Sequence, residues 1–285
     1  MKSKYFYPAL HRIIILLIIV TMAASAPAEA KRRKKSYAPL TAQSAVLYDT
    51  ADSRRLFGKN IHNRVLPAST AKVMTALVVL ERLPLDRVVK ISKRATLPQP
   101  SKLNLKPGEQ YKVTELLYGL LLNSANDASV ALAEAVAGSE WEFVQLMNRR
   151  AKQLGAKNTK FANSSGLPAP KVSQYTTAHD MYLIFREAMK YPFFREAIHH
   201  PYKTIHSLAG RKIYLKSHNN SLFMADWKKK VYGKTGYTRT AGPCFVGTIK
   251  KGKRTLIVAV FKSSRRWDYI KYILKKYGGI NVAAG

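Results

Sequence analysis

The sequence contains one cysteine, Cys244, so the chain cannot form an internal disulfide bond and neither requires nor excludes an oxidising compartment. Acidic residues are also few, because 16 Asp and Glu stand against 49 Lys and Arg, and the formal net charge is +33. Such a charge favours anionic partners, either nucleic acid or anionic lipid headgroups and wall polymers. Repeats and low-complexity segments are absent, and 47% hydrophobic residues exclude a fibrous or mostly disordered chain.

The sequence has no apolar run long enough for a comfortable transmembrane helix, which needs about 20 residues. Residues 1–30 instead have a basic start, a short apolar core at Ile13–Val20 and an A-x-A site at Ala28–Ala30. This layout predicts a secretory signal peptide that is cleaved near Ala30, and hence an exported protein of the periplasm or cell envelope. The alternative is an uncleaved N-terminal anchor, because the basic run Lys31–Lys35 resists translocation. Export makes envelope lipid or wall polymer a better anionic partner than nucleic acid.

Residues 31–43 resemble a flexible basic lead-in, and residues 44–285 are long enough for one catalytic domain. Strand patterns stand at both ends of that region and helix patterns in the middle. We therefore expect an α/β protein of the α+β type, with a central antiparallel sheet built from both chain ends, flanking helices and an inserted helical lobe. The expected strands are 44–49, 55–57, 241–249 and 254–261, and the expected helices begin near 69, 114, 127, 139, 177 and 264.

Three helix starts carry capping signals. Ser139 with Glu142 forms a capping box, Thr177 with Asp180 repeats it, and Thr114 is a candidate N-cap.

The first string with chemical meaning is Ser69-x-x-Lys72, at the start of an almost wholly apolar helix. Residues i and i+3 share one helix face, so the amine can reach the hydroxyl. Serine is a weak nucleophile until a base takes its proton, and burial lowers the pKa of a lysine enough to make it that base. The pair alone is a weak signal.

The second string is Ser124-Ala125-Asn126, at the junction of two expected helices. The hydroxyl would relay a proton and the amide would hold a substrate backbone. Ser217-His218-Asn219 fits the same pattern, and each of them alone is more typical of a turn or cap.

The third string is Lys234-Thr235-Gly236, before a strand pattern. Lysine and threonine offer donors to a carboxylate, and glycine lets a substrate backbone approach closely. This triplet is the most specific of the three.

Together these strings resemble the signature of the serine D-Ala-D-Ala carboxypeptidases, the low-molecular-mass penicillin-binding proteins, whose motifs are shared with class A β-lactamases. The resemblance covers roughly residues 44–265 and selects Ser124 over the Ser217 alternative. It extends beyond the three strings to Leu66–Ala76, Leu116–Ala128, Phe161–Leu167, Thr176–Asp180 and Lys234–Thr238 with Ala241-Gly242.

The resemblance implies a role for each site residue. Ser69 would be the nucleophile and acyl carrier, Lys72 its general base and Ser124 the proton relay. The other implied roles are substrate orientation by Asn126, binding of the terminal carboxylate by Lys234 and Thr235, close backbone approach at Gly236, and an oxyanion hole from the N–H groups of Ser69 and Tyr237. The family acts on peptidoglycan D-Ala-D-Ala peptides, is acylated by β-lactams and needs no metal or other cofactor.

The sequence departs from the family pattern in three places. The family often has an acidic residue and a glycine shortly before the Lys-Thr-Gly string, where this sequence has Val231-Tyr232-Gly233. An arginine that often lies further upstream is replaced near Asn219-Asn220. We also expect neither the C-terminal β-domain nor the amphipathic anchor that many relatives have. Carboxylate recognition should therefore differ in detail, and a DD-endopeptidase that cuts crosslinks is the alternative to a carboxypeptidase.

Other function classes fit less well. A class A β-lactamase needs a glutamate for deacylation, and no glutamate occurs between Glu142 and Glu187. A non-catalytic basic binder of nucleic acid or envelope polymer would not need the three strings. A metal site is not expected, because His199, His200, His206 and His218 lack zinc-ligand spacing. The sequence does not determine the oligomeric state.

Overall fold

The computed structural model describes residues 41–169, 172–218 and 230–282. The expected signal peptide, most of the basic lead-in and the Asn219-Asn220 position lie outside the described residues. Within the described ranges, no helix combines the length and apolar character needed to cross a membrane.

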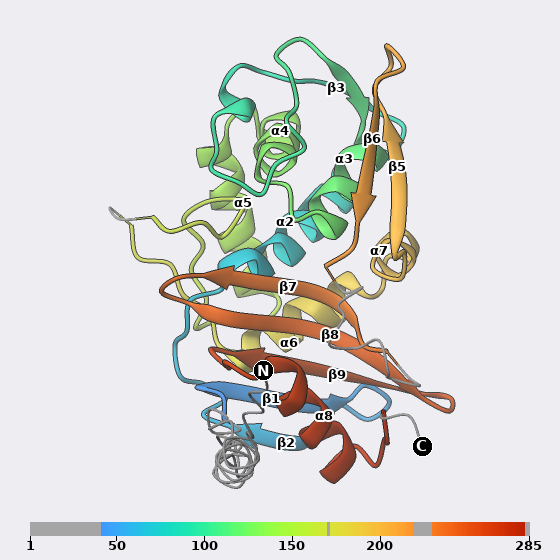
Figure 1. Cartoon of the computed structure of the whole chain (residues 1–285). Helices are drawn as coiled ribbons and strands as arrows, with labels where there is room; N and C mark the ends of the chain where they lie inside the picture. Colours follow the sequence, from blue (N-terminus) through green and yellow to red (C-terminus); the bar gives the residue numbers. More distant parts are fainter. Residues whose placement is uncertain (1–40, 170–171, 219–229, 283–285) are drawn as a thin grey trace, which may run out of the picture. The chain divides into compact units, whose positions relative to one another are not determined.

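A five-stranded antiparallel sheet joins the two ends of the described chain (Figure 1). N-terminal β1 pairs with C-terminal β9, with Ser44 opposite Phe261 and Asp49 opposite Leu256. The expected sheet is thus confirmed, with β7 at one edge. The strand order is β2-β1-β9-β8-β7, and the strands are β1 (Ser44–Asp49), β2 (Arg54–Lys59), β7 (Tyr232–Thr238), β8 (Gly242–Lys251) and β9 (Arg254–Phe261).

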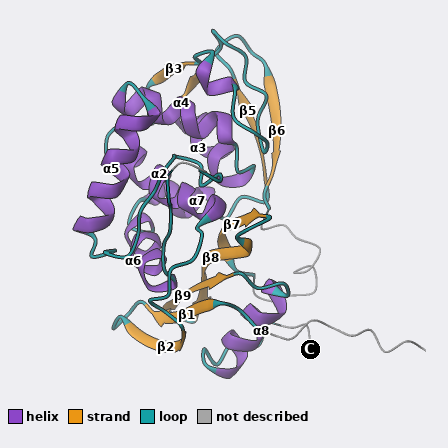
Figure 2. Ribbon diagram, turned by 90° about the vertical axis from the view of Figure 1, so that its left-hand side faces the viewer, coloured by secondary structure: helices purple, strands orange, loops and turns teal. Residues whose placement is uncertain are grey.

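The central strands are apolar on both sides because helices cover both faces of the sheet. Along β1, Val46 and Tyr48 pack with the helical lobe, whereas Ala45 and Leu47 belong to a second core. Helix α6 (Ala178–Ala188) contacts β1, β8 and β9, and α8 (Arg266–Lys276) contacts β8 and β9. Figure 2 shows α6 and α8 on opposite sides of the sheet.

The helical lobe is built around α2, whose residues from Lys72 to Val79 are all buried. Helices α3, α4, α5 and α6 all contact α2, which confirms the expectation, drawn from its apolar sequence, that this helix is buried.

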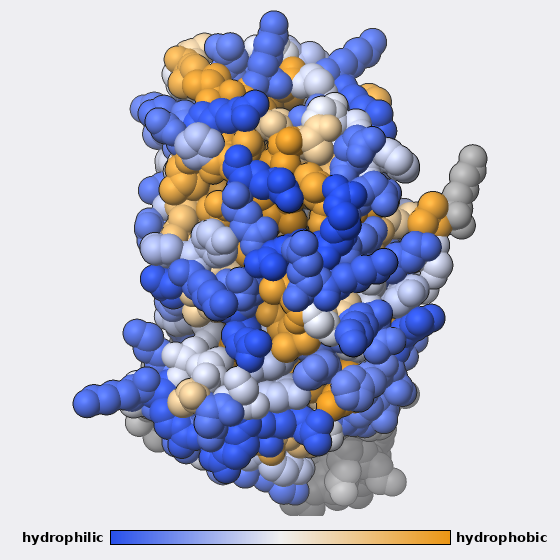
Figure 3. Space-filling model, turned by 180° about the vertical axis from the view of Figure 1, so that it is seen from behind, coloured by the Kyte–Doolittle hydropathy of each residue, from blue (hydrophilic) through white to orange (hydrophobic). Residues whose placement is uncertain are grey.

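Seen from behind, hydrophilic residues cover most of the surface of the protein, and hydrophobic residues show mainly in its upper half (Figure 3). The remaining elements are η1 (Ala68–Ala71), α2 (Lys72–Leu80), β3 (Val88–Lys90), η2 (Arg94–Thr96), β4 (Gln110–Lys112), α3 (Val113–Leu122), α4 (Asn126–Ala137), α5 (Glu140–Gln153) and α7 (Pro192–Ala197).

Two of the three expected helix caps are confirmed. The Ser139 hydroxyl accepts from the Glu142 N–H at 3.1 Å, and the Thr177 hydroxyl accepts from the Asp180 N–H at 3.0 Å. The prediction that Thr114 caps α3 is wrong, because β4 leads directly into the helix at Val113. The Thr114 hydroxyl instead donates to the Leu85 carbonyl oxygen at 2.7 Å.

The hairpin of β5 (Tyr202–His206) and β6 (Lys212–Lys216) was not expected from the sequence. Its strands contain many basic and polar residues, and only Ile205 and Leu215 are fully buried. These two side chains face the helical lobe, where both strands contact α3. The buried side of each strand is too short to produce a clear alternating pattern.

Candidate active site

Ser69 lies in the short helix η1, in a turn fixed by close packing. The Thr70 hydroxyl donates to the Pro67 carbonyl oxygen at 2.6 Å, and Ala68 has a left-handed φ of +46°. Gly166 presses against this turn from another loop. A Cβ atom there would lie 1.8 Å from the Ala68 carbonyl oxygen, so only glycine allows this approach.

Lys72 begins α2 and is completely buried beside Ser69. Its Nζ lies 2.7 Å from Asn126 Oδ1, 2.7 Å from the Ser165 carbonyl oxygen and 3.2 Å from Ser69 Oγ. A neutral amine has two hydrogens and one lone pair. The two short contacts to pure acceptors use both hydrogens, so the lone pair is left for the Ser69 hydroxyl, as a general base requires.

The surroundings favour this neutral amine. Burial, and then the charge of Lys234, lower the pKa of Lys72 well below its usual value, against the opposing charges of Asp127 and Glu140. Lys234 is buried in turn, and burial together with the charge of Arg266 lowers its pKa to about 7. The charge of Arg266 thus weakens protonation of Lys234, and the charge of Lys234 weakens protonation of Lys72.

The second string lies where the chain turns from α3 into α4. Ser124 has a left-handed φ of +58°, and its side chain lines the same cavity as Ser69. Asn126 is held firmly, because its N–H donates to the Ser101 carbonyl oxygen at 2.8 Å and its Nδ2 donates to the Gln99 carbonyl oxygen at 2.6 Å. The second hydrogen on Nδ2 stays available for a ligand.

The third string forms part of the edge strand β7. A Cβ atom on Gly236 would lie 3.1 Å from the Ser69 backbone nitrogen. The strand therefore passes directly beside the turn of residues 67–71, named here the nucleophile turn because it holds the candidate nucleophile Ser69. Tyr237 is paired with Pro243, which has no N–H, and its side chain is 66% exposed. Because β7 contacts η1 and both Ser69 and Tyr237 line the cavity, their backbone N–H groups belong to neighbouring segments of the site.

A cavity of about 750 Å³ brings residues of all three strings together, and among its described lining residues there is no carboxylate. A second cavity of about 760 Å³ lies beside α7, near His199 and Tyr232, but no Ser–Lys pair lines it. Size therefore does not identify the site, whereas the side-chain chemistry does. Of the predicted residues, Ser69, Ser124, Thr235, Gly236 and Tyr237 line the first cavity, and Lys72, Asn126 and Lys234 lie buried around it.

Sequence reasoning missed Arg266, which reaches this cavity from the start of α8. Its guanidinium donates to the carbonyl oxygens of Cys244 at 2.8 Å and Gly236 at 3.3 Å. Burial lowers its pKa to about 10. A signal was present in the sequence: the pair Arg265-Arg266 at a helix N-terminus opposes the helix dipole, which disfavours cations there.

The alternative second string is only partly described. Ser217 and His218 line the same cavity, and Asn219 lies outside the described residues. Lys72 donates to Asn126 of the first candidate string, which agrees with the choice of Ser124.

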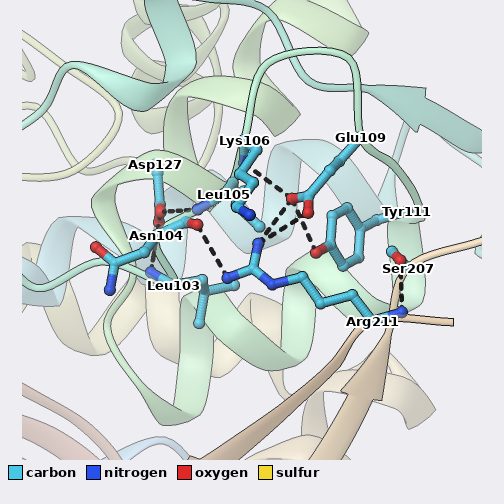
Figure 4. Close-up of polar contacts among 9 residues, drawn as sticks. All are labelled: Leu103, Asn104, Leu105, Lys106, Glu109, Tyr111, Asp127, Ser207 and Arg211. Carbon is cyan, nitrogen blue, oxygen red and sulfur yellow. Dashed lines mark hydrogen bonds and ion pairs between the residues drawn. The ribbon is translucent and has the colours of Figure 1, made fainter. Parts of the chain in front are cut away.

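A loop of residues 97–109, named here the roof loop, forms the upper wall of the cavity. Asp127 holds it from below, because its carboxylate accepts from the N–H groups of Leu103 and Leu105 (Figure 4). Arg211, in the β5–β6 turn, holds it from outside, with both Glu109 oxygens at 2.9 Å and the Asn104 carbonyl oxygen at 3.1 Å.

Comparisons with known proteins find a matching family and several similar proteins. Residues 29–265 match the sequence profile of the D-alanyl-D-alanine carboxypeptidase family. D-alanyl-D-alanine carboxypeptidase DacF of Bacillus subtilis is 36% identical over 245 residues, which are 84% of this chain and 62% of that protein. DacB2 of Mycobacterium tuberculosis is 36% identical over 219 residues, 77% of this chain and 74% of that protein.

A crystal structure of the D-alanyl-D-alanine carboxypeptidase of Mycobacterium tuberculosis H37Rv superposes with a TM-score of 0.78. It is 31% identical, and the match covers 88% of this chain and 98% of that one. A D-alanyl-D-alanine endopeptidase of Pseudomonas aeruginosa is 31% identical over 77% of this chain and 71% of that protein. The chain spans less than two thirds of the length of the Bacillus subtilis relative.

Proposed function

This chain belongs to the D-alanyl-D-alanine carboxypeptidase family, and from that membership we propose that it is a serine DD-peptidase acting on peptidoglycan stem peptides. It removes the terminal D-Ala of a D-Ala-D-Ala end and is acylated by β-lactams at the same serine. The observation that carries the proposal is the buried Lys72 amine, whose lone pair is left for Ser69 Oγ at 3.2 Å. No metal or other cofactor enters the proposed reaction.

In the proposed acylation, Lys72 takes the proton of Ser69 as Oγ bonds to the carbonyl carbon of the penultimate D-Ala. The N–H groups of Ser69 and Tyr237 stabilise the resulting oxyanion, which is worth about 3 kcal/mol per donor in serine hydrolases. The C–N bond then breaks, and the proton passes from Lys72 through Ser124 to the leaving amine. Water hydrolyses the ester and releases Ser69.

The terminal carboxylate of the substrate is bound by the cations on the other side of the nucleophile. Lys234 and Thr235 present donors from β7, and Arg266 adds a guanidinium that donates to Gly236 of the same strand. We propose that Arg266 takes part in carboxylate recognition, which offsets the departures from the family pattern at 219–220 and 231–233. Bidentate guanidinium–carboxylate pairing is well suited to this task.

The acyl-enzyme formed with a penicillin should persist. The described lining of the cavity offers no carboxylate to activate a deacylating water. Glu140 is near enough for its charge to affect the pKa of Lys72, but it does not line the cavity, and its carboxylate accepts a hydrogen bond from the Ser164 hydroxyl. This supports a penicillin-binding peptidase rather than a β-lactamase.

We further propose that the chain is exported to the periplasm or cell envelope, on the basis of the signal-peptide pattern in residues 1–30. Cleavage after Ala30 would remove three cations and one anion from the +33 chain and leave +31. That charge would hold the enzyme close to anionic lipid or wall polymer.

The first test is the intact mass of the protein after brief exposure to benzylpenicillin, with Ser69→Ala beside the wild type. One persistent adduct on the wild type and none on the variant supports the nucleophile and the family mechanism. A folded wild type without an adduct contradicts the proposal, and rapid drug turnover without accumulation points to a β-lactamase. Fusing residues 1–30 to a reporter and sequencing the N-terminus of the exported product tests the export proposal separately.

A further inference from the structure

The proposed carboxylate site determines which way the substrate lies in the cavity. The Lys234–Arg266 side binds the leaving residue, so the leaving group lies towards the beginning of β7. His218 lines the cavity together with Thr235 and Arg266, which places it on that same side. Burial, and then the charges of Lys234 and Arg266, lower the pKa of His218 to about 4, in agreement with this position. His218, Ser217 and Lys216 line the cavity directly after β6. The β5–β6 hairpin therefore begins where the leaving group departs.

One face of this hairpin continues outward from the cavity. It consists of three cross-strand pairs, which step away from the cavity in the order Tyr202 with Lys216, Thr204 with Tyr214 and His206 with Lys212. We name these six residues the hairpin face; all are exposed, whereas the side chains of Ile205 and Leu215 point into the helical lobe. Figure 1 shows the hairpin beside the helical lobe, above the beginning of β7.

The hairpin face combines aromatic and cationic groups. Tyr214 is 64% exposed, and its ring stacks on Tyr202 with centroids 5.7 Å apart and planes 18° from parallel. Lys212 and Lys216 stand on either side of Tyr214 along β6, and no member of the face is acidic. The four residue steps from Lys212 to Lys216 span about 13 Å, which is the length of several residues of an extended ligand.

A free D-Ala-D-Ala end does not extend to this face, because its chain ends at the carboxylate bound by Lys234. A crosslinked substrate does extend to it, since the displaced amine belongs to the side chain of a second stem peptide. That peptide carries further carboxylates, which complement Lys212 and Lys216, and apolar surface that can pack on Tyr214.

We propose that the hairpin face binds the second stem peptide of crosslinked peptidoglycan, so that this enzyme also cuts crosslinks. The inference rests on the proposed function. The reaction is the same acyl transfer: the ester to Ser69 forms, the crosslinking C–N bond breaks, and the freed side-chain amine receives the proton before water hydrolyses the ester.

The experiment presents the full chain with an equimolar mixture of a crosslinked muropeptide dimer and the uncrosslinked pentapeptide monomer, and follows both by liquid chromatography and mass spectrometry. The test variant is Lys212→Glu with Tyr214→Ser, neither of which lines the cavity. The matched control, Lys253→Glu with Tyr272→Ser, makes the same chemical changes at exposed positions on β8–β9 and α8.

The wild type and the control should cut both substrates. The test variant should lose about tenfold in kcat/KM for the dimer alone, mainly through KM, as expected for one aromatic and one screened charge contact. Its pentapeptide trimming and its benzylpenicillin acylation should be unchanged. Salt at 0.5 M should reduce the dimer preference of the wild type more than that of the variant.

Different results separate the two proposals. Equal dimer cleavage by the test variant and the wild type overturns the role of the hairpin face, as does a wild type that trims pentapeptide but leaves the dimer intact. Absence of penicillin acylation in the folded wild type would instead overturn the proposed function itself.

Discussion

The two walls of the active-site cavity hold their functional groups in different ways. The lower wall consists of β7 and the nucleophile turn, and a continuous ladder of backbone pairs with β8 positions Lys234, Thr235 and Gly236. The upper wall consists of the roof loop and the α3–α4 turn. There, Asn126 donates one hydrogen bond to the Gln99 carbonyl oxygen and one to the Ser101 carbonyl oxygen. The roof loop itself is held by the side chains of Asp127 and Arg211.

This difference shows where the site is sensitive to mutation. A backbone ladder survives the loss of one side chain, so the lower wall should respond mainly to added volume. A loop held by buried side-chain acceptors loses several bonds when one carboxylate is removed, so the upper wall should lose stability and activity together.

Asp127→Ala should have the largest effect. It leaves the buried N–H groups of Leu103, Leu105 and Ala128 without their acceptor. We expect a loss of about 3 kcal/mol in the free energy of unfolding, at about 1–3 kcal/mol for each unsatisfied group. Acylation by benzylpenicillin should slow about 100-fold, equivalent to about 2.7 kcal/mol in the barrier.

Urea titration and stopped-flow acylation measure these two losses. Asp127→Asn is the control, because it keeps one oxygen acceptor in nearly the same volume and should recover part of both quantities. If stability falls while acylation stays normal, the roof loop does not position the second string.

Gly236→Ala tests the lower wall by adding one carbon. The new Cβ would lie 3.1 Å from the Ser69 nitrogen and 3.2 Å from Ala68 Cβ, so the nucleophile turn must shift. We expect acylation to slow about 30-fold, whereas overpacking at this edge should cost about 1 kcal/mol of stability. A large loss of stability with normal acylation would remove the contrast between the walls.

The pH dependence tests the buried cations of the lower wall. The proposed acylation uses neutral Lys72, so its rate should fall about tenfold per pH unit on the acid side of the Lys72 pKa. The proposed carboxylate binding uses charged Lys234, whose pKa is about 7. The second-order acylation constant for benzylpenicillin should therefore fall as pH rises above that value.

Benzylpenicillin methyl ester provides the control, because it has no carboxylate. Its profile should keep the acid limb and lose the alkaline one. Identical alkaline limbs for both compounds would show that Lys234 does not bind the carboxylate.

Arg211→Met should have the smallest effect, because the side chain is only partly buried and its ion pair with Glu109 is screened by solvent. We expect a loss of about 1 kcal/mol in stability and about a threefold slower acylation, since Asp127 still holds the roof loop. Lys212→Met, one residue further along, should change neither. A loss as large as that of Asp127→Ala would mean that the hairpin is the main support of the roof loop.

The local patterns of the sequence were sufficient for much of the fold. Strand patterns at both ends of the chain predicted a sheet that joins them, and the apolar run after Lys72 predicted a buried helix. The sequence predicts the Ser139 and Thr177 caps because a capping hydroxyl accepts its hydrogen bond from an N–H group only three residues later in the chain. The β5–β6 hairpin was missed because each of its strands buries very few side chains.

What the sequence by itself determined is the chemistry of the site: a serine and a lysine on one helix face, and two further strings whose order and spacing resemble those of one family. Only the tertiary structure decided which distant groups complete that site. Arg266 follows Lys234 by many residues, yet it reaches the cavity because α8 begins beside β7. Asp127 and Arg211 both bind the roof loop, at different points, only because α4 and the hairpin lie beside that loop (Figure 4). Contacts of this kind depend on the packing of segments far apart in the chain, and no local pattern contains that information.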